Sequence, residues 1–499
     1  MGYDGAANRA TGGVLMASTR PNILLFVSDQ QQWQTVCGRG PARSPRIDRL
    51  AAEGLRFERP YATVALCCPS RAALLSGQFP WHNGILNQVH VPERIRADMV
   101  PDVQTYSRRL DEAGYRLGYS GKWHASWGRL PTDFGFHDLV EPSGCNPALL
   151  RAAGFAVPAR RREAIEAECR VQWPGDVPHV FYGIDHGPEE ATGAHIETSA
   201  GIALIERYAR ETPDRPWFVT INVVEPHDPY LPLARYAANY DPADVELPAS
   251  WRDDFAGKPN LNRREAGLWA AMGEGEVRAA IARYWAYCEQ VDAQVGRALD
   301  ALDRTGRAGD TLVVFTSDHG DMAGAHRQFI KGWQPYEETY RVPLVLRWPG
   351  VVAPGGVCHR LVQLHDLAHT FVDVAGAAPI APADGRSLLP LLRDPGAAWE
   401  DVAFCQYYGG EFLYTQRMVI TPQHKYVFNG WDFDELYDLT EDPHELRNAI
   451  DDPAYRDIAD ALRGLLWERM ERHGDPYAQN RYGAARYLPR ADSARKELP

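Results

Sequence analysis

Five short apolar runs constrain the fold of this chain more than any other feature of its sequence. They cover Asn22–Ser28, Tyr115–Ser120, Trp217–Val224, Thr311–Ser317 and Leu344–Trp348. Continuous apolar runs of this length are typical of strands that are buried on both faces, as in parallel sheets covered by helices. The runs therefore predict a central sheet that lies between two layers of helices.

Helical patterns separate these runs. We predict short helices over Pro45–Gly54 and Val103–Ala113, and longer ones over Thr198–Arg210 and Val277–Leu302. Strands that alternate with amphipathic helices indicate a layered α/β/α fold. With 499 residues, of which 45% are apolar, the chain is long enough to bury a sizeable core.

Polar residues follow each of the first four runs. The segments are Asp29-Gln30, Gly121-Lys122-Trp123-His124, Glu225-Pro226-His227-Asp228 and Asp318-His319-Gly320-Asp321. Open α/β sheets bind their ligands beyond the carboxyl ends of the strands, so these segments are expected to converge on one edge. Any one of them has an ordinary explanation, because loops are polar in general. Together, four segments rich in Asp, His and Lys predict a functional site.

The rest of the chain divides into regions that differ in composition and in predicted secondary structure. We predict a disordered leader at 1–19, and a main α/β domain at 20–395 that contains a variable insertion at 141–197. A smaller α+β subdomain with an antiparallel sheet is expected at 396–499. Its predicted elements are hairpin strands over Arg417–Ile420 and Lys425–Phe428, a helix over Ala454–Arg472 and a polar tail.

Charge and composition exclude several classes of partner. A net charge of −13 argues against nucleic acid, which favours a basic surface. The chain has no run of eighteen apolar residues, so we predict neither a spanning helix nor a membrane partner. Its eight cysteines lack zinc-type spacing, and its first twenty residues lack the apolar core of a signal peptide. We therefore expect a cytoplasmic protein with reduced thiols, and a homo-oligomer is left open.

The segment Cys67–Gly77 carries the strongest chemical signal. Its Cys-x-Pro-Ser-Arg pattern opens a run that is predicted to start a helix. A phosphatase-type catalytic thiolate would require an arginine six residues after the cysteine, where this chain has Ala73. An inert buried cysteine is the ordinary alternative for Cys67, and it is the interpretation we keep for Cys68. The segment resembles the signature of the type I sulfatases, in which the first cysteine is oxidised to Cα-formylglycine.

This resemblance covers about residues 20–450 and implies both a fold and a nucleophile. The fold would be that of the alkaline phosphatase superfamily, which has a large mixed β-sheet sandwiched between helices and a smaller C-terminal α+β subdomain. The hydrated formylglycine made from Cys67 would attack the sulfate group, and its second hydroxyl would allow sulfate to be expelled. Arg71 would stabilise negative charge on this diol. The modification also implies a formylglycine-generating enzyme as a partner in maturation.

Further motifs imply further site residues by the same resemblance. In the Gly-Lys-Trp-His segment, Lys122 would bind the sulfate and His124 would hold or deprotonate the diol. In the Pro-His-x-Pro-Tyr segment, His227 would face the leaving oxygen, where an imidazole suits the role of general acid. Lys331 is expected to be a second sulfate-binding cation. Asn87 resembles an asparagine that contacts the transferred group, with an ordinary turn residue as the alternative.

Asp29, Gln30, Asp318 and His319 resemble the metal ligands of sulfatases, and the modified Cys67 would add one more ligand. Oxygen ligands suit Ca²⁺ best, with Mn²⁺ or Mg²⁺ as alternatives. Where this chain has Asp29-Gln30, the common family pattern has two acids, and where it has Asp318-His319, the common pattern has Asp-Asn. The pairs Asp29-Gln30 and Asp318-His319 instead resemble the branch of choline sulfatase and the phosphonate monoester hydrolases. This departure leaves the identity of the metal and the role of Gln30 open.

The leading hypothesis is a sulfuric ester hydrolase that acts on a small-molecule or saccharide sulfate ester. A phosphonate monoester hydrolase or phosphodiesterase on the same scaffold is the alternative, because its substrates also carry a single negative charge. A catalytically inactive binding protein is a third hypothesis, although such a protein is expected to lose Cys67 or Arg71. The sequence does not identify the alcohol. Tyr230, Trp251 and Trp269 are candidate stacking surfaces, with core packing as the alternative.

Overall fold

The computed structural model describes residues 20–157, 164–172, 177–410, 413–430 and 432–479. The predicted leader at 1–19 and the polar tail from residue 480 onward lie outside the described residues.

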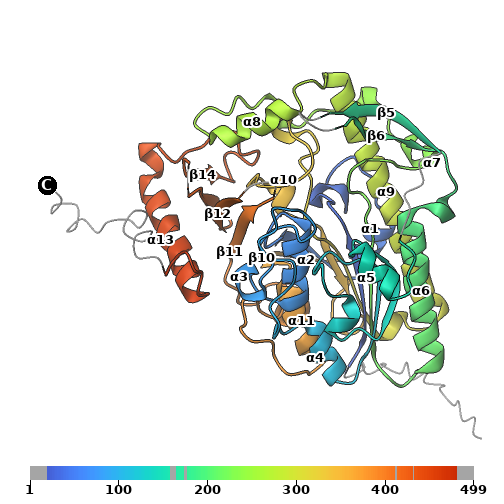
Figure 1. Cartoon of the computed structure of the whole chain (residues 1–499). Coiled ribbons are helices and arrows are strands. Elements are labelled where there is room, and N and C mark those ends of the chain that lie inside the picture. Colours follow the sequence, from blue (N-terminus) through green and yellow to red (C-terminus); the bar gives the residue numbers. More distant parts are fainter. Residues whose placement is uncertain (1–19, 158–163, 173–176, 411–412, 431, 480–499) are drawn as a thin grey trace, which may run out of the picture.

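A large eight-stranded sheet forms the centre of the molecule (Figure 1). Across the sheet the strands follow the order β10-β2-β9-β8-β1-β7-β3-β4. Strand β9 pairs antiparallel with both neighbours, and the other pairs are parallel, so the sheet is mixed as expected. The bounds are β1 Asn22–Ser28, β2 Leu55–Tyr61, β3 Arg116–Lys122, β4 Asp138–Ser143, β7 Trp217–Asn222, β8 Thr311–Ser317, β9 Leu344–Arg347 and β10 Gly356–Gln363.

Strand β1 shows why the apolar runs form strands in the middle of this sheet. All seven of its residues are buried. Successive side chains of a strand point to opposite faces. Accordingly, Ile23, Leu25 and Val27 belong to one hydrophobic core, whereas Leu24 and Phe26 belong to another. A continuous apolar run is therefore the pattern that a strand between two cores requires.

Helices cover both faces of the large sheet. One layer packs on the core of Leu24 and Phe26, and consists of α1 (Pro45–Ala52), α6 (Gly193–Glu211) and α9 (Glu274–Arg304). The opposite layer packs on the core of Ile23, Leu25 and Val27, and includes α2 (Cys67–Ser76), α4 (Tyr106–Glu112), α11 (Asp366–Val374) and α12 (Leu389–Arg393). The four predicted helices are confirmed, with ends shifted by a few residues. Short helices α3 (Pro80–Asn83), α5 (Pro147–Ala152), α7 (Ala234–Ala237), α8 (Asn260–Leu268) and α10 (Glu337–Tyr340) occupy the connections.

The predicted insertion contains a small two-stranded antiparallel sheet, made of β5 (Ile165–Val171) and β6 (His179–Asp185). It packs on a third hydrophobic core that includes Phe181, Tyr230 and Trp269. The rings of Tyr230 and Trp269 both contact Phe181, with centroids 5.1 Å and 4.8 Å away. Core packing therefore explains these two candidate stacking residues.

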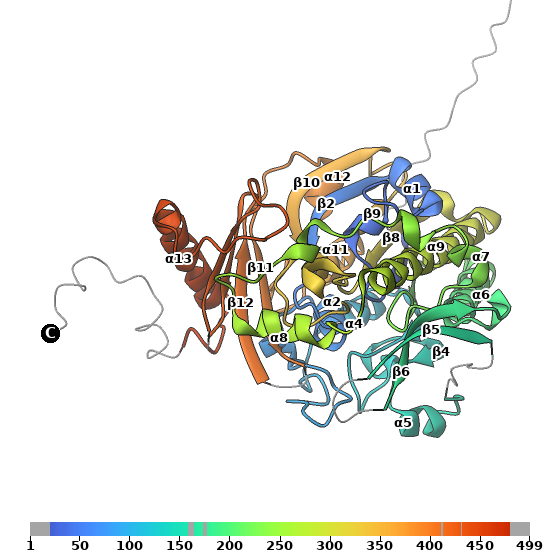
Figure 2. The ribbon, with the colours of Figure 1, turned by 90° about the horizontal axis from the view of Figure 1, so that it is seen from above.

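The C-terminal part forms a second sheet, which is antiparallel and has the order β11-β12-β13-β14. Its strands are β11 Ala403–Gly409, β12 Leu413–Ile420, β13 His424–Phe428 and β14 Glu435–Asp438. The predicted hairpin corresponds to β12 and β13. Helix α13 (Arg456–Arg472) covers the face of this sheet that points away from the large sheet (Figure 2). The domain boundary at residue 396 stays a prediction.

Among the described residues, no helix combines the length and the apolar composition that crossing a bilayer requires.

Candidate active site

The polar segments that follow β1, β3, β7 and β8 meet at the carboxyl edge of the large sheet. Helix α2 begins at this edge with Cys67, which is buried. Its Sγ atom lies 3.7 Å from Oδ1 of Asp29 and 3.2 Å from Nε2 of His319. In a matured enzyme, the oxygens of formylglycine would stand near the place that Sγ occupies. The predicted nucleophile and metal ligands are therefore brought together by two strand ends and one helix start.

Four side chains form a compact donor set: Asp29, Cys67, Asp318 and His319 are all buried, and their ligand atoms lie within 4.8 Å of one another. Burial, and next the charge of Asp29, raise the pKa of Asp318. Burial alone would lower the pKa of His319, but Asp318 and Cys67 raise it to about 8. Burial and Cys67 would raise the pKa of Asp29, but Lys122 and other nearby cations lower it below its usual range. A cation bound between Asp29 and Asp318 would relieve the repulsion between these adjacent buried carboxylates.

Three cationic side chains surround the nucleophile position. The ammonium of Lys122 contacts Oδ2 of Asp29, and Lys331 donates to Oε1 of Gln30 over 2.5 Å. Nε of Arg71 donates to Oδ2 of Asp318 over 2.7 Å. Burial would lower the pKa of Lys331, but Cys67 and nearby carboxylates raise it above its usual range. Three cations thus gather at one place within an acidic chain, which suits an anionic substrate.

Two histidines lie beside these cations. His124 shares a hydrogen bond with Cys67, and burial, followed by the charge of Lys122, lowers the pKa of His124 to about 3. Its imidazole is therefore neutral near pH 7 and can accept a proton. Nδ1 of His227 lies 2.8 Å from the carbonyl oxygen of Asp228, and its Nε2 contacts the ammonium of Lys331. Nδ1 therefore carries a proton that it donates to this carbonyl, and Nε2 faces the site.

Backbone turns direct two of these segments into the site. Gln30 and His124 each follow a strand closely, and both adopt left-handed backbone conformations with φ of 69° and 53°. Residues other than glycine adopt this region at a cost of about 1–3 kcal/mol, and they do so mostly at functional sites. The strain is consistent with side chains that are aimed at a ligand.

Asp321 is a site residue to which the sequence assigned no role. Its Oδ2 accepts from Nε2 of Gln30 at 2.5 Å and from the hydroxyl of Tyr230 at 2.7 Å. Its Oδ1 accepts from the backbone N–H groups of Ala323 and Ile330. This carboxylate therefore fixes Gln30 and the backbone just before Lys331. The sequence signal that could have indicated Asp321 as a site residue is that it is a second acid, two residues after His319.

Ser70 and Asn222 also support the site without having been predicted. The hydroxyl of Ser70 donates to the carbonyl oxygen of Asp318 over 2.6 Å. Oδ1 of Asn222 lies 3.4 Å from Nη1 of Arg71, and the same Nη1 donates to the carbonyl oxygen of Lys122. The Ser and Arg of the Cys-x-Pro-Ser-Arg pattern thus tie α2 to the strand ends.

Two predicted residues make contacts outside the donor set. The side chain of Asn87 holds its own loop, since it donates to the carbonyl oxygen of Glu93 and accepts from the N–H of Ile95. The side-chain amide of Gln30 bridges Lys331 and Asp321, and only its backbone N–H contacts Asp318, at 3.1 Å. Substrate contact by Asn87 and metal ligation by Gln30 stay predictions.

A partly exposed rim lies above the buried donor set. His124 and Lys331 are both intermediate in exposure, and the side chain of His227 is 21% exposed, whereas Asp29, Asp318 and His319 are fully buried. A substrate would therefore approach past these three basic side chains.

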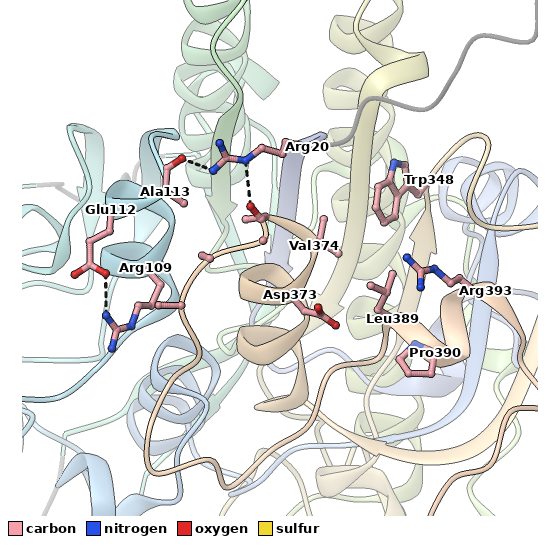
Figure 3. Close-up of a pocket in the computed structure, with 14 residues that line it drawn as sticks. Arg20, Arg109, Glu112, Ala113, Trp348, Asp373, Val374, Leu389, Pro390 and Arg393 are labelled. Carbon is pink, nitrogen blue, oxygen red and sulfur yellow. Dashed lines mark hydrogen bonds and ion pairs between the residues drawn. The ribbon is translucent and has the colours of Figure 1, made fainter.

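A cavity of about 940 Å³ lies elsewhere, at the opposite edge of the large sheet (Figure 3). Arg20, just before β1, donates there to the carbonyl oxygens of Ala375 and Ala113. Trp348, just after the antiparallel strand β9, and Arg393 also line this cavity. Its remaining lining residues come from the ends of α4 and α11 and from α12, and they share no residue with the described site around Cys67.

Comparison with known proteins agrees with this geometry. Residues 21–377 match the family model "Sulfatase", and residues 324–472 match "N-sulphoglucosamine sulphohydrolase, C-terminal". The chain is 30% identical to the uncharacterized sulfatase YidJ of Escherichia coli, over 92% of this chain and 88% of that protein. It is 25% identical to an N-acetylglucosamine-6-O-sulfatase of Bacteroides thetaiotaomicron, over 91% and 87%.

Among solved structures, the phosphonate monoester hydrolase of Agrobacterium radiobacter superposes with a TM-score of 0.75. It shares 24% sequence identity, and the match covers 91% of this chain and 96% of that one. This likeness confirms the expected fold, in which a large mixed sheet between helices is joined to a smaller C-terminal sheet. The first family model alone spans most of the described main sheet and each of the strand-end segments. The chain belongs to the sulfatase family.

Proposed function

We propose that this sulfatase-family enzyme hydrolyses sulfate monoesters with a nucleophile made by converting Cys67 to formylglycine. The observation that carries the proposal is the convergence of three cations, Arg71, Lys122 and Lys331, around Cys67 beside a donor set of two carboxylates and an imidazole. An inert packing cysteine would need neither these cations nor these donors.

The donor chemistry at this site fits a divalent cation. Asp29, Asp318 and His319 would hold it, together with the modified residue 67, and Gln30 is the proposed further ligand. The carboxylate oxygens favour Ca²⁺, with Mn²⁺ or Mg²⁺ as alternatives that the imidazole of His319 would accept. When bound, such a cation lowers the pKa of the nucleophile and stabilises negative charge on sulfate oxygens.

The reaction replaces the S–O bond to the alcohol with an S–O bond to an oxygen derived from water. Lys122 and Lys331 would bind the sulfate oxygens and stabilise the charge that develops on them. The ammonium of Lys331 contacts Nε2 of His227, and a proton held between them would pass to the leaving oxygen, which departs as the alcohol. Neutral His124 would accept a hydroxyl proton from the hydrated residue 67, whose second hydroxyl makes the expulsion of sulfate possible. Overall, a sulfate ester and water give an alcohol, sulfate and one proton.

The proposal includes maturation and substrate class. A formylglycine-generating enzyme would modify Cys67 in the cytoplasm, where we expect this enzyme to act. The similarity to an N-acetylglucosamine-6-O-sulfatase supports sulfated saccharides as the first substrates to test. Small sulfate esters remain within the proposal, as does a homo-oligomer.

Two measurements on one preparation test the proposal. Intact-protein mass spectrometry should show the loss of mass that accompanies replacement of the Cys67 sulfur by oxygen and removal of two hydrogens. Turnover of aryl and saccharide sulfates should depend on this modified fraction. Cys67→Ala should abolish turnover, and Cys68→Ala is the matched control that should retain it. An unmodified Cys67 in a fully active preparation would overturn the proposed nucleophile.

Phosphonate monoester or phosphodiester hydrolysis is the second candidate function. It is favoured by the Asp318-His319 pair beside Cys67 and by the structural likeness to a phosphonate monoester hydrolase. Rates on a sulfate and a phosphonate monoester with the same alcohol would decide between the two. Good phosphonate cleavage with negligible sulfate cleavage would reverse our choice.

A further inference from the structure

We propose that Cys68, His90 and His124 form a second metal site, specific for soft cations such as Zn²⁺, through which such a cation inhibits the enzyme. Cys68 belongs to the same helix start as the nucleophile, and His90 lies in the loop that Asn87 braces. We call these three residues the thiol–imidazole site.

The three side chains are gathered beside the nucleophile. Sγ of Cys68 lies 4.0 Å from Nδ1 of His90. The rings of His90 and His124 are stacked, with centroids 4.7 Å apart and planes 21° from parallel. The ligand atoms of all three residues lie within 4.8 Å of one another. The bond lengths of zinc to sulfur and nitrogen place the ligand atoms of a tetrahedral site about 3.5 Å apart. The ligand atoms of the three residues must therefore move about 1 Å closer to one another.

The local surroundings allow this closure. His90 is exposed, so its ring can rotate and a cation can enter from solvent. Nδ1 of His124 is buried and has no hydrogen-bond partner among the described residues. Binding would release the thiol proton of Cys68 to solvent as the sulfur–metal bond forms.

The donor set separates this site from the neighbouring one. One thiolate and two imidazoles, with water in a fourth position, match the preferences of Zn²⁺ and exclude Ca²⁺ and Mg²⁺. The carboxylate-rich set of Asp29 and Asp318 has the opposite preference. Two cations of different softness would therefore occupy adjacent places without exchanging.

Inhibition follows from the identity of one ligand. His124 shares a hydrogen bond with Cys67 and is the proposed proton acceptor at that residue. When an imidazole coordinates a metal, one ring nitrogen donates its lone pair to the metal. The charge of the metal then lowers the basicity of the other ring nitrogen. Zn²⁺ bound at the thiol–imidazole site would therefore remove the base while leaving the substrate-binding lysines in place.

Metal binding can be tested without turnover. The Cys67→Ala protein, saturated with Ca²⁺, should bind one Co²⁺ with an intense sulfur-to-cobalt charge-transfer absorption. The Cys67→Ala/Cys68→Ala protein should bind Co²⁺ without this absorption, because among the described residues no other cysteine joins His90 and His124 in a group of candidate ligands. Equal absorption in both proteins, or none in either, would overturn the site. This experiment uses an inactive nucleophile variant, so its result is independent of the proposed sulfatase activity.

Inhibition is tested on the active enzyme in excess Ca²⁺. Cys68→Ala and His90→Ala should leave the basal rate unchanged and weaken inhibition by Zn²⁺ at least tenfold, since each removes one of three ligands. His90→Ala changes an exposed side chain, so it remains informative if Cys68→Ala lowers the melting temperature. Unchanged Zn²⁺ inhibition in both variants would mean that Zn²⁺ acts at the carboxylate-rich site instead, and would overturn the inhibitory role.

Discussion

Two clusters of charge lie in the interior of the protein, and their lysines are paired in different ways. The catalytic cluster consists of the buried side chains of Asp29, Arg71, Lys122 and Asp318, with the partly exposed Lys331 at its rim. The junction cluster lies between the main sheet and the C-terminal sheet, and consists of Asp253, Lys258, Glu337, Lys425 and Glu445. Both clusters combine lysines with carboxylates in the interior of the protein.

The junction cluster surrounds its lysines with carboxylates. Nζ of Lys425 lies 2.9 Å from Glu337, 2.7 Å from Glu445 and 3.0 Å from the carbonyl oxygen of Pro335. The facing Oε1 atoms of both glutamates have no hydrogen-bond partner among the described residues, so these two contacts are ion pairs without well-aligned hydrogen bonds. Nζ of Lys258 likewise contacts Asp253 and the carbonyl oxygen of Glu445. Each lysine of this cluster is therefore paired with at least one buried carboxylate, which suits a contact that holds two sheets together.

The catalytic cluster leaves binding capacity unused. Nη2 of Arg71 is buried without a hydrogen-bond partner among the described residues. Among the described residues, Lys331 has no carboxylate within ion-pair distance, and its short contacts are Oε1 of Gln30 and Nε2 of His227. A lysine without a carboxylate partner at a partly exposed rim, rather than burial or charge alone, therefore distinguishes the candidate ligand site from the junction cluster.

The largest expected effect separates the clusters by activity. Lys331→Ala should lower kcat/KM for a sulfate monoester by about a thousandfold, because it removes a positive charge that stabilises the transition state. Its melting temperature should stay near that of the parent, since the lysine makes no ion pair with a carboxylate among the described residues. Steady-state kinetics and a thermal melt check both parts. A stable enzyme with nearly full activity would remove Lys331 from the catalytic cluster.

The second prediction separates the clusters by stability. Lys425→Met should destabilise the protein by about 3 kcal/mol, because it removes the ammonium that lies between the buried Glu337 and Glu445. Denaturant unfolding, read by tryptophan fluorescence, measures this change. The control Lys425→Met/Glu445→Gln should recover part of the loss. At temperatures where the variant is folded, kcat should stay within about threefold of the parent. A larger loss of kcat would show that the junction cluster influences the catalytic cluster.

Gly320→Ala tests the physical link between the two clusters. An added Cβ would lie 1.9 Å from the carbonyl oxygen of Glu338 in α10, and the N–H of Gly320 donates to Thr339. The clash must displace either α10 or the loop that carries His319, so both activity and stability should fall, stability by about 2 kcal/mol. Gly309→Ala, where an added Cβ meets nothing within 4 Å, is the matched control. Loss of stability alone would show that the loop tolerates movement of α10.

The smallest effect is a pH dependence that arises beside the junction cluster. Burial raises the pKa of Glu338 to about 7. The unfolded chain releases this proton above about pH 4.5, so the folded state binds more protons between these values and loses stability as pH rises from about 5 to 8. Glu338→Gln should remove on the order of 1 kcal/mol of this loss. Unfolding free energies of parent and variant at pH 5 and pH 8 provide the test, and parallel pH profiles would contradict it.

Much of the fold was predictable because its strongest signals are local. The runs Asn22–Ser28 and Thr311–Ser317 become strands with the same bounds, since a strand between two cores must be apolar on both faces. Strands β2 (LRFERPY) and β10 (GVCHRLVQ) were not predicted, because their polar residues hide the pattern. They form through pairing with each other, a contact between segments some 300 residues apart in sequence.

The candidate site likewise contains some residues that were predictable from the sequence and others that were not. The spacing of Cys67 and Arg71, and the acids after β1 and β8, were readable because each belongs to a continuous motif. The roles of Asp321 and Cys68 were not readable, because a carboxylate that fixes Gln30 and a thiol that faces His90 exist only after distant loops meet.

The sequence by itself determined the layered sheet, the helix start at Cys67 and the residue types that meet at the strand ends. These follow from short-range rules: the period of side chains along a strand, the chemistry of a motif and the preference of ligands for strand ends. Tertiary structure alone decided which lysines are paired with carboxylates. Glu337, Lys425 and Glu445 come from separate segments, and whether an ammonium meets a carboxylate depends on how those segments pack. That difference separates the cluster at the junction of the two sheets from the proposed anion site.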